Sequence, residues 1–156
     1  MIIRNMVLRL GFRNVGAVVV GLVAGMAVNM VIGALAWVLY PMPEGVGFSD
    51  AEGVAAYMAA LPIAVFLIVL AAHLSQAFVG GWVAARISPN QPMVVAMIVG
   101  TLTLVGGVVN MKSIPMPTWM MVEFPLYLIV AWAAARMEIN RRGGRGLDEI
   151  LSDWGF

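Results

Sequence analysis

The stretch Pro62–Arg86, PIAVFLIVLAAHLSQAFVGGWVAAR, decides the fold of this chain because it is long and apolar enough to cross a lipid bilayer. An α-helix rises about 1.5 Å per residue, so roughly 20 apolar residues span the hydrocarbon core. The stretch nevertheless carries His73 and Gln76 near its middle. Polar side chains at that depth are costly unless they are paired, so other segments must supply partners for them.

The composition of the whole chain indicates the same class of protein. Of its 156 residues, 62% are hydrophobic and only 11% are charged, whereas soluble domains carry about 25% charged residues. The net charge is +1 and the basic residues form no stripe, which excludes a nucleic-acid partner. There are no cysteines, so disulfides and thiolate metal sites are excluded. The sequence therefore predicts an all-α, polytopic protein that lies in a lipid bilayer.

Three further apolar segments are predicted to span the bilayer, which makes a four-helix transmembrane bundle. The first is too long for the apolar core of a secretory leader, which has about 7–15 residues, so it is predicted to be retained. The residues before it fit either a short surface helix or the first turns of that span. The predicted spans cover about 14–40, 62–86, 93–110 and 118–137, within a transmembrane domain of residues 1–140 and before a tail of residues 141–156.

The basic residues indicate the orientation of this bundle. Eight of the nine Lys and Arg residues precede the first span, end the second, or lie at or after the end of the fourth, and only Lys112 lies on the other side. Basic residues concentrate on the cytoplasmic side of membrane proteins. Both termini are therefore predicted to be cytoplasmic, with the acidic loop 41–53 outside.

Two short helices are predicted beside the four spans. Ser49 and Glu52 form a capping box, which predicts a helix over about 50–60 at the outer membrane surface. After the glycine-rich stretch NRRGGRG, apolar residues return at helical spacing and predict a short amphipathic helix over 147–154. Acids beside them would be repelled by an anionic leaflet, which favours a protein partner. The candidate docking residues are Leu147, Ile150, Leu151 and Trp154.

Polar residues of three spans are predicted to form a layer near the middle of the bilayer. Its candidate members are Asn29, His73, Gln76, Thr101 and Thr103. One interpretation is a pathway or small-solute site with His73 as the group that changes charge near neutral pH. The other is that these side chains only hydrogen-bond between helices, with Asn29 as the expected partner of His73.

Glycines and one charged pair complete the candidate sites. Small residues let helices approach closely, and the candidate packing positions are Gly21, Gly25, Gly80, Gly100 and Gly107. Lys112 and Glu123 flank a short turn near the outer leaflet and are predicted to form an ion pair. An outside carboxylate that takes up a cation or proton is the alternative for Glu123. Pro125 is predicted to kink the fourth span.

The sequence shows none of the constellations on which catalysis depends. It has no nucleophile and base pair, no glycine-rich phosphate loop and no carboxylate dyad, so no enzyme activity is predicted. No cofactor is predicted either. A copper site of the clustered methionines is disfavoured because methionine is also an ordinary apolar residue, and a haem is disfavoured because there is one histidine.

Three stretches resemble an uncharacterised family of small bacterial membrane proteins with four spans. They are AAHLSQAFVGGWVAARIS at 71–88, GGVVNMKSIPMPTW at 106–119, and Asn29 followed by a Tyr-Pro-x-Pro turn. The resemblance implies a bacterial cytoplasmic membrane and four spans, and it carries over no catalytic residue. The position of Gln76 is usually glycine in that family, so Gln76 departs from its pattern.

Two functions fit these observations. The first is a non-catalytic subunit, structural or accessory, that packs within a larger membrane complex or with copies of itself. It rests on the small-residue positions and on the amphipathic tail. The alternative is a small transporter or channel that uses the polar layer around His73.

Overall fold

The structure is a computed structural model that describes residues 2–47 and 49–153, with the side chains of 2–10, 113 and 145–153 left aside. The described residues form helices and no strand, and four helices are long and apolar enough to cross a membrane, as predicted. The elements are α1 (Ile2–Leu39), α2 (Ala51–Ala60), α3 (Ile63–Ile87), α4 (Pro92–Ser113), the 3-10 helix η1 (Thr118–Val122) and α5 (Glu123–Asp153). The candidate spans are Gly11–Leu39, Ile63–Ile87, Pro92–Lys112 and Thr118–Gly144.

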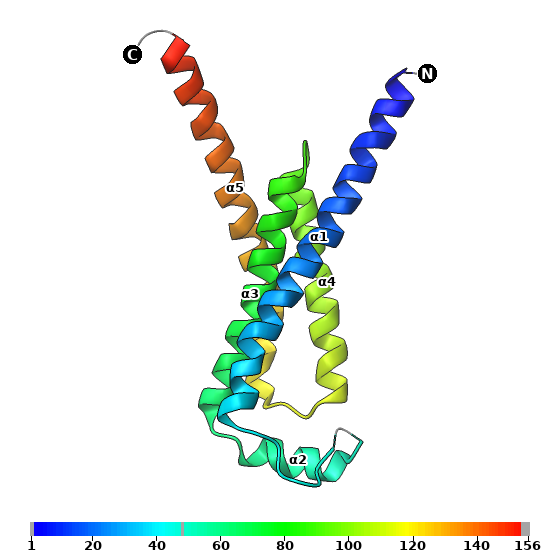
Figure 1. Cartoon of the computed structure of the whole chain (residues 1–156), viewed down its shortest axis with the longest axis vertical. Helices are drawn as coiled ribbons and strands as arrows, with labels where there is room; N and C mark the ends of the chain where they lie inside the picture. The colour runs from blue at the N-terminus through cyan, green and yellow to red at the C-terminus, as the bar shows by residue number, and fades with distance from the viewer. Residues whose placement is uncertain (1, 48, 154–156) are drawn as a thin grey trace.

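Helix α3 is the centre of the bundle and packs against α1, α4 and α5 (Figure 1). The start of α1 and the end of α5 lie at one end of the molecule, which we call the terminal end, and there the two helices diverge. Helix α2 crosses the opposite end, the α2 end. The segment Pro62–Arg86 therefore supplies the helix around which the other three spans are arranged.

Small residues bring the helices together. A Cβ on Gly21 would lie 2.5 Å from the carbonyl oxygen of Gly80, and one on Gly25 would lie 2.5 Å from that of Gln76, so α1 touches the backbone of α3. A Cβ on Gly100 would lie 2.6 Å from the Cβ of Ala131 of α5. Gly107 leaves room for the ring of Tyr127, 3.0 Å from where its Cβ would be. All five predicted packing glycines lie at such contacts between helices.

Two buried apolar clusters lie toward the terminal end. Ala84, Val95 and Val99 form one buried cluster, against which Val18 and Leu22 of α1 pack. A second cluster joins α3, α4 and α5 through three alanines, Ala85, Ala96 and Ala135. Short side chains fill this region, so the helices are close together there and leave the larger spaces nearer the α2 end.

The start of α2 differs from the sequence-based expectation, and the start of α1 agrees with one of the two predicted alternatives. Helix α2 is capped by Asp50, whose carboxylate accepts a hydrogen bond of 3.0 Å from the backbone N–H of Gly53, and Ser49 is not the cap. Helix α1 runs without a break from Ile2, so the residues before the first span continue it. Asp50 takes the cap one residue later because Asp is as good an N-cap as Ser, and Gly53 at N3 has no side chain with which to complete a capping box.

The C-terminal region also differs from the sequence-based expectation. Helix α5 is continuous to Asp153, whereas a glycine-broken tail with a separate helix over 147–154 was expected. Glycine costs a helix about 1 kcal/mol per residue but does not stop it as proline does. Arg141 and Arg142 donate hydrogen bonds to the carboxylate of Glu138, one turn earlier on the same helix. These bonds support the helix just before the glycines. The side chains of Leu147, Ile150 and Leu151, and the whole of Trp154, lie outside the described residues.

Candidate functional site

The centre of the site is a hydrogen bond between two titratable side chains of different helices. Nδ1 of His73 on α3 lies 2.9 Å from Oε2 of Glu123 at the start of α5. The carboxylate is buried, with Glu123 only 3% exposed, and His73 is half-buried. Tyr127, one turn after Glu123, is also buried, and its ring centre lies 6.5 Å from that of His73.

Local backbone structure explains how Glu123 reaches His73. The 3-10 helix Thr118–Val122 precedes α5 and turns inward, with Met120 buried. Pro125 then falls in the first turn of α5, where its missing N–H has no helical partner to lose. The expected kink at Pro125 is therefore wrong, because the α-helix begins at Glu123 and does not run through the proline.

This geometry corrects the predicted pair of Lys112 and Glu123. Lys112 is exposed in the last turn of α4, while the ion pair that Glu123 makes is with His73. A buried carboxylate needs a partner in the interior, and a lysine at the exposed end of a neighbouring helix is not available there. Asn29, the expected partner of His73, lies beside it as a lining residue of the same cavities.

Two cavities meet at His73. The first, which we call the α2 cavity, measures about 450 Å³ and lies among α1, α2, α3 and α4 toward the α2 end. The second, the midspan cavity, measures about 470 Å³ and is also lined by Gln76, Thr103 and Tyr127. Asn29, His73 and Asn110 line both. His73 therefore belongs to the wall between them, and both are partly open.

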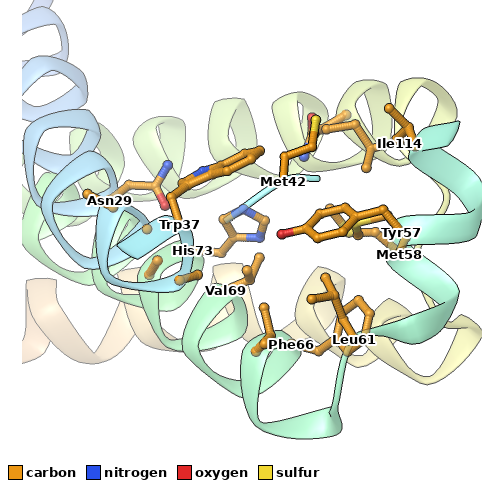
Figure 2. Close-up of a pocket in the computed structure, with 18 of the residues that line it drawn as sticks. Asn29, Trp37, Met42, Tyr57, Met58, Leu61, Phe66, Val69, His73 and Ile114 are labelled. Carbon is orange, nitrogen blue, oxygen red and sulfur yellow. The ribbon is translucent and has the colours of Figure 1, made fainter. Parts of the chain in front are cut away.

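The lining of the α2 cavity is mostly apolar and aromatic. Figure 2 shows Trp37 from α1, Tyr57 from α2 and Phe66 from α3 around the space, with the His73 ring and the Tyr57 hydroxyl pointing toward one another. The Tyr57 hydroxyl donates a 2.6 Å hydrogen bond to the carbonyl of Tyr40, which fastens α2 over this cavity. The rings of Phe66 and Trp119 pack nearly perpendicular to one another, with ring centres 6.5 Å apart.

The predicted polar layer is assembled only in part. Thr103 is buried and lines the midspan cavity, but its hydroxyl donates to the carbonyl of Val99 on its own helix. Thr101 is exposed and its hydroxyl bonds to Met97, so it is not a member of the layer. Two residues along a helix turn by about 200°, so Thr101 and Thr103 cannot face the same cavity.

A second buried carboxylate lies near the terminal end. Glu138 is 0% exposed and bonds to both Arg141 and Arg142 of its own helix. Arg142 also donates to carbonyls in the last turn of α3, at 2.5 Å to Ala85 and 3.0 Å to Arg86, and to the carbonyl of the C-cap residue Ser88 at 3.0 Å. These bonds satisfy the unpaired carbonyls at the end of a helix and join α5 to α3.

Sequence reasoning missed two residues of the site, Asn110 and Tyr127. It also missed that Glu123 pairs with His73. The spacing of Glu123 and Tyr127, four residues apart in an apolar segment, places both on one face and was the available indication. Among the described residues, no group of three His, Asp or Glu side chains comes close enough together to hold a metal ion.

No family model, no curated protein and no solved structure matches this chain.

Proposed function

We propose that this chain is a small membrane transport protein in which the His73–Glu123 pair binds and releases a proton as a solute passes. The position of this pair supports the proposal. His73 lines two cavities and is hydrogen-bonded to the buried carboxylate of Glu123. Ionisable residues inside a membrane domain are costly and mark ion or substrate paths.

The charge of the pair supports a proton-binding role. With one shared proton the pair is neutral overall, as an imidazolium and a carboxylate or as an imidazole and a carboxylic acid. When that proton leaves, a net charge of −1 remains in a low-dielectric interior, where an unpaired charge is costly. The pair can exchange a proton by itself, and the arrival of a positive charge promotes release of that proton.

The proposal includes an orientation in the membrane. The distribution of basic residues favours a cytoplasmic terminal end, with the α2 cavity reached from outside. The packed clusters of short side chains then close the cytoplasmic side, while the α2 cavity is partly open. A bacterial cytoplasmic membrane is the location that the sequence resemblance implies.

Proton movement in proteoliposomes tests this function. We expect wild-type protein to speed the decay of an imposed pH gradient, read with an enclosed pH-sensitive dye at a clamped membrane potential. Glu123→Gln and His73→Phe should slow this decay severalfold, because each removes one member of the pair. Thr101→Val is the control, since Thr101 is a polar residue of the same span region that faces away from the cavities. Equal rates for wild type and Glu123→Gln would refute the proposal.

A second candidate is an accessory subunit of a larger membrane assembly. The divergence of α1 and α5 at the terminal end favours it, since this leaves two long helical segments apart from the bundle (Figure 1). Purification from its own membrane in mild detergent separates the two functions. A partner that stays bound to the full chain and is lost on deletion of residues 146–156 would favour the subunit.

A further inference from the structure

We propose that the solute of the α2 cavity is a lipophilic organic cation, which enters as the His73–Glu123 pair gives up its proton. The inference rests on the proposed proton site and names the class of ligand that the site takes. Three features of the cavity lead to it, namely its charge, its walls and its size.

The charge favours a cation. Without its proton, the pair leaves one negative charge in the bundle, held on Glu123 behind the His73 ring. The other titratable side chains that face the pair are Tyr127 of α5 and Tyr57 of α2, and neither carries a positive charge. Helices α1 and α4 contribute only uncharged polar groups, Asn29 and Asn110. A bound cation would neutralise the site.

His73 also offers an atom to such a cation. Its Nδ1 is engaged by Glu123, and no hydrogen bond of the described residues involves Nε2. Nε2 is not among the buried atoms that lack a partner, so it is reached from the cavities that His73 lines. When Nδ1–H donates to the carboxylate, Nε2 carries a lone pair, which directs negative potential into the cavity.

The walls select an organic cation over a metal ion. Trp37, Tyr57 and Phe66 present aromatic rings, whose faces attract cations, and Figure 2 shows them around the space. Four methionines, Met30, Met42, Met58 and Met116, add polarisable apolar surface. A hard metal ion needs about six oxygen ligands. This lining supplies few oxygens and would leave such an ion stripped of water.

The size agrees with a compact organic molecule. The α2 cavity of about 450 Å³ lies within the range of about 300–1,000 Å³ that ligand pockets occupy. The cavity is partly open at the surface of the bundle, and its lining includes residues from α1, α2, α3 and α4. A lipophilic cation can therefore reach it with its apolar body against the walls and its charge toward His73.

Tetraphenylphosphonium and tetraphenylborate provide the test, since the two ions have nearly the same shape and opposite charge. Binding to the full chain in mild detergent is measured by calorimetry. We expect the phosphonium to bind and the borate not to bind above a detergent blank. Phosphonium affinity should rise with pH, by up to about tenfold per pH unit when binding displaces one proton.

Variants locate the site. Glu123→Gln should weaken phosphonium binding at least about tenfold and abolish its pH dependence, because the charge that balances the cation is gone. Trp37→Leu should weaken binding about threefold to tenfold by removing an aromatic wall. Trp132→Leu is the matched control, because Trp132 is an exposed tryptophan of α5 that does not line the cavity. Size-exclusion profiles and helical circular dichroism establish that each variant is folded.

The outcomes separate the inference from the proposed function. Equal binding of both ions, or unchanged phosphonium binding by Glu123→Gln, would overturn the inference. Proton movement that depends on Glu123 without phosphonium binding would overturn only the inference and leave the proton site standing. Phosphonium binding with the expected pH dependence, but without proton movement in proteoliposomes, would support the ligand class and refute transport.

Discussion

The close contact between α1 and α3 gives the sharpest quantitative prediction, for Gly25→Ala. A Cβ on Gly25 would lie 2.5 Å from the carbonyl oxygen of Gln76, about 0.9 Å inside the 3.4 Å at which ordinary contact begins. That oxygen belongs to the backbone of α3 and cannot rotate away, so the two helices must separate locally. Added carbon atoms in a packed interior cost about 1–3 kcal/mol, and we expect about 2 kcal/mol of lost stability.

Gly16→Ala on the same helix is the matched control. No atom lies within 4 Å of the position that its Cβ would take. Alanine favours a helix over glycine by up to about 1 kcal/mol, so this variant should be as stable as wild type or slightly more so. Reversible unfolding in mixed micelles of a mild detergent and sodium dodecyl sulfate, followed by tryptophan fluorescence, measures both variants. If Gly25→Ala proves as stable as Gly16→Ala, the close approach of α1 to α3 is refuted.

Two further predictions concern the ends of the bundle. Arg142→Ala should destabilise the fold by about 2 kcal/mol, because Glu138 loses one partner and the end of α3 loses its capping donor. Arg136→Ala should change the stability little, since Arg136 lies over the ring of Trp132, an exposed residue of the same helix. Unfolding in mixed micelles compares the two variants, and equal stabilities would contradict the role of Arg142. Tyr57→Phe should remove about 1 kcal/mol by deleting the bond to Tyr40. In this variant the backbone amides of α2 should exchange hydrogen faster, while those of α3 exchange as in wild type. Unchanged exchange in α2 would contradict the role of the Tyr57–Tyr40 hydrogen bond in holding α2 in place.

The candidate site shows where sequence reasoning reached its limit. His73 was identified because an imidazole in an apolar run demands a partner, and Gly25 and Gly80 because small residues permit close packing. The partner was assigned to Asn29, since both residues fall at similar depth along straight helices. The structure gives that place to Glu123, because a 3-10 segment moves the start of α5 into the interior.

The same limit applies to the second carboxylate. In the sequence, Glu138 directly follows the predicted end of the fourth span at residue 137, and nothing there predicts its burial. In the structure it is fully buried, since α5 continues past it and Arg141 and Arg142 fold back over it. Arg142 also bonds to the end of α3, a contact between helices that the local sequence does not contain.

The sequence by itself determined that the chain is helical and lies in a membrane. Apolar length and the scarcity of charge are local properties, and the helix is the only structure in which such a segment pairs its backbone groups within itself. It also determined which positions are small enough for contact. Only the tertiary structure decided which polar groups meet. The pairing of His73 with Glu123, and the cavities on either side, depend on how far each helix is shifted along its neighbours, and that shift is set by packing over the whole bundle.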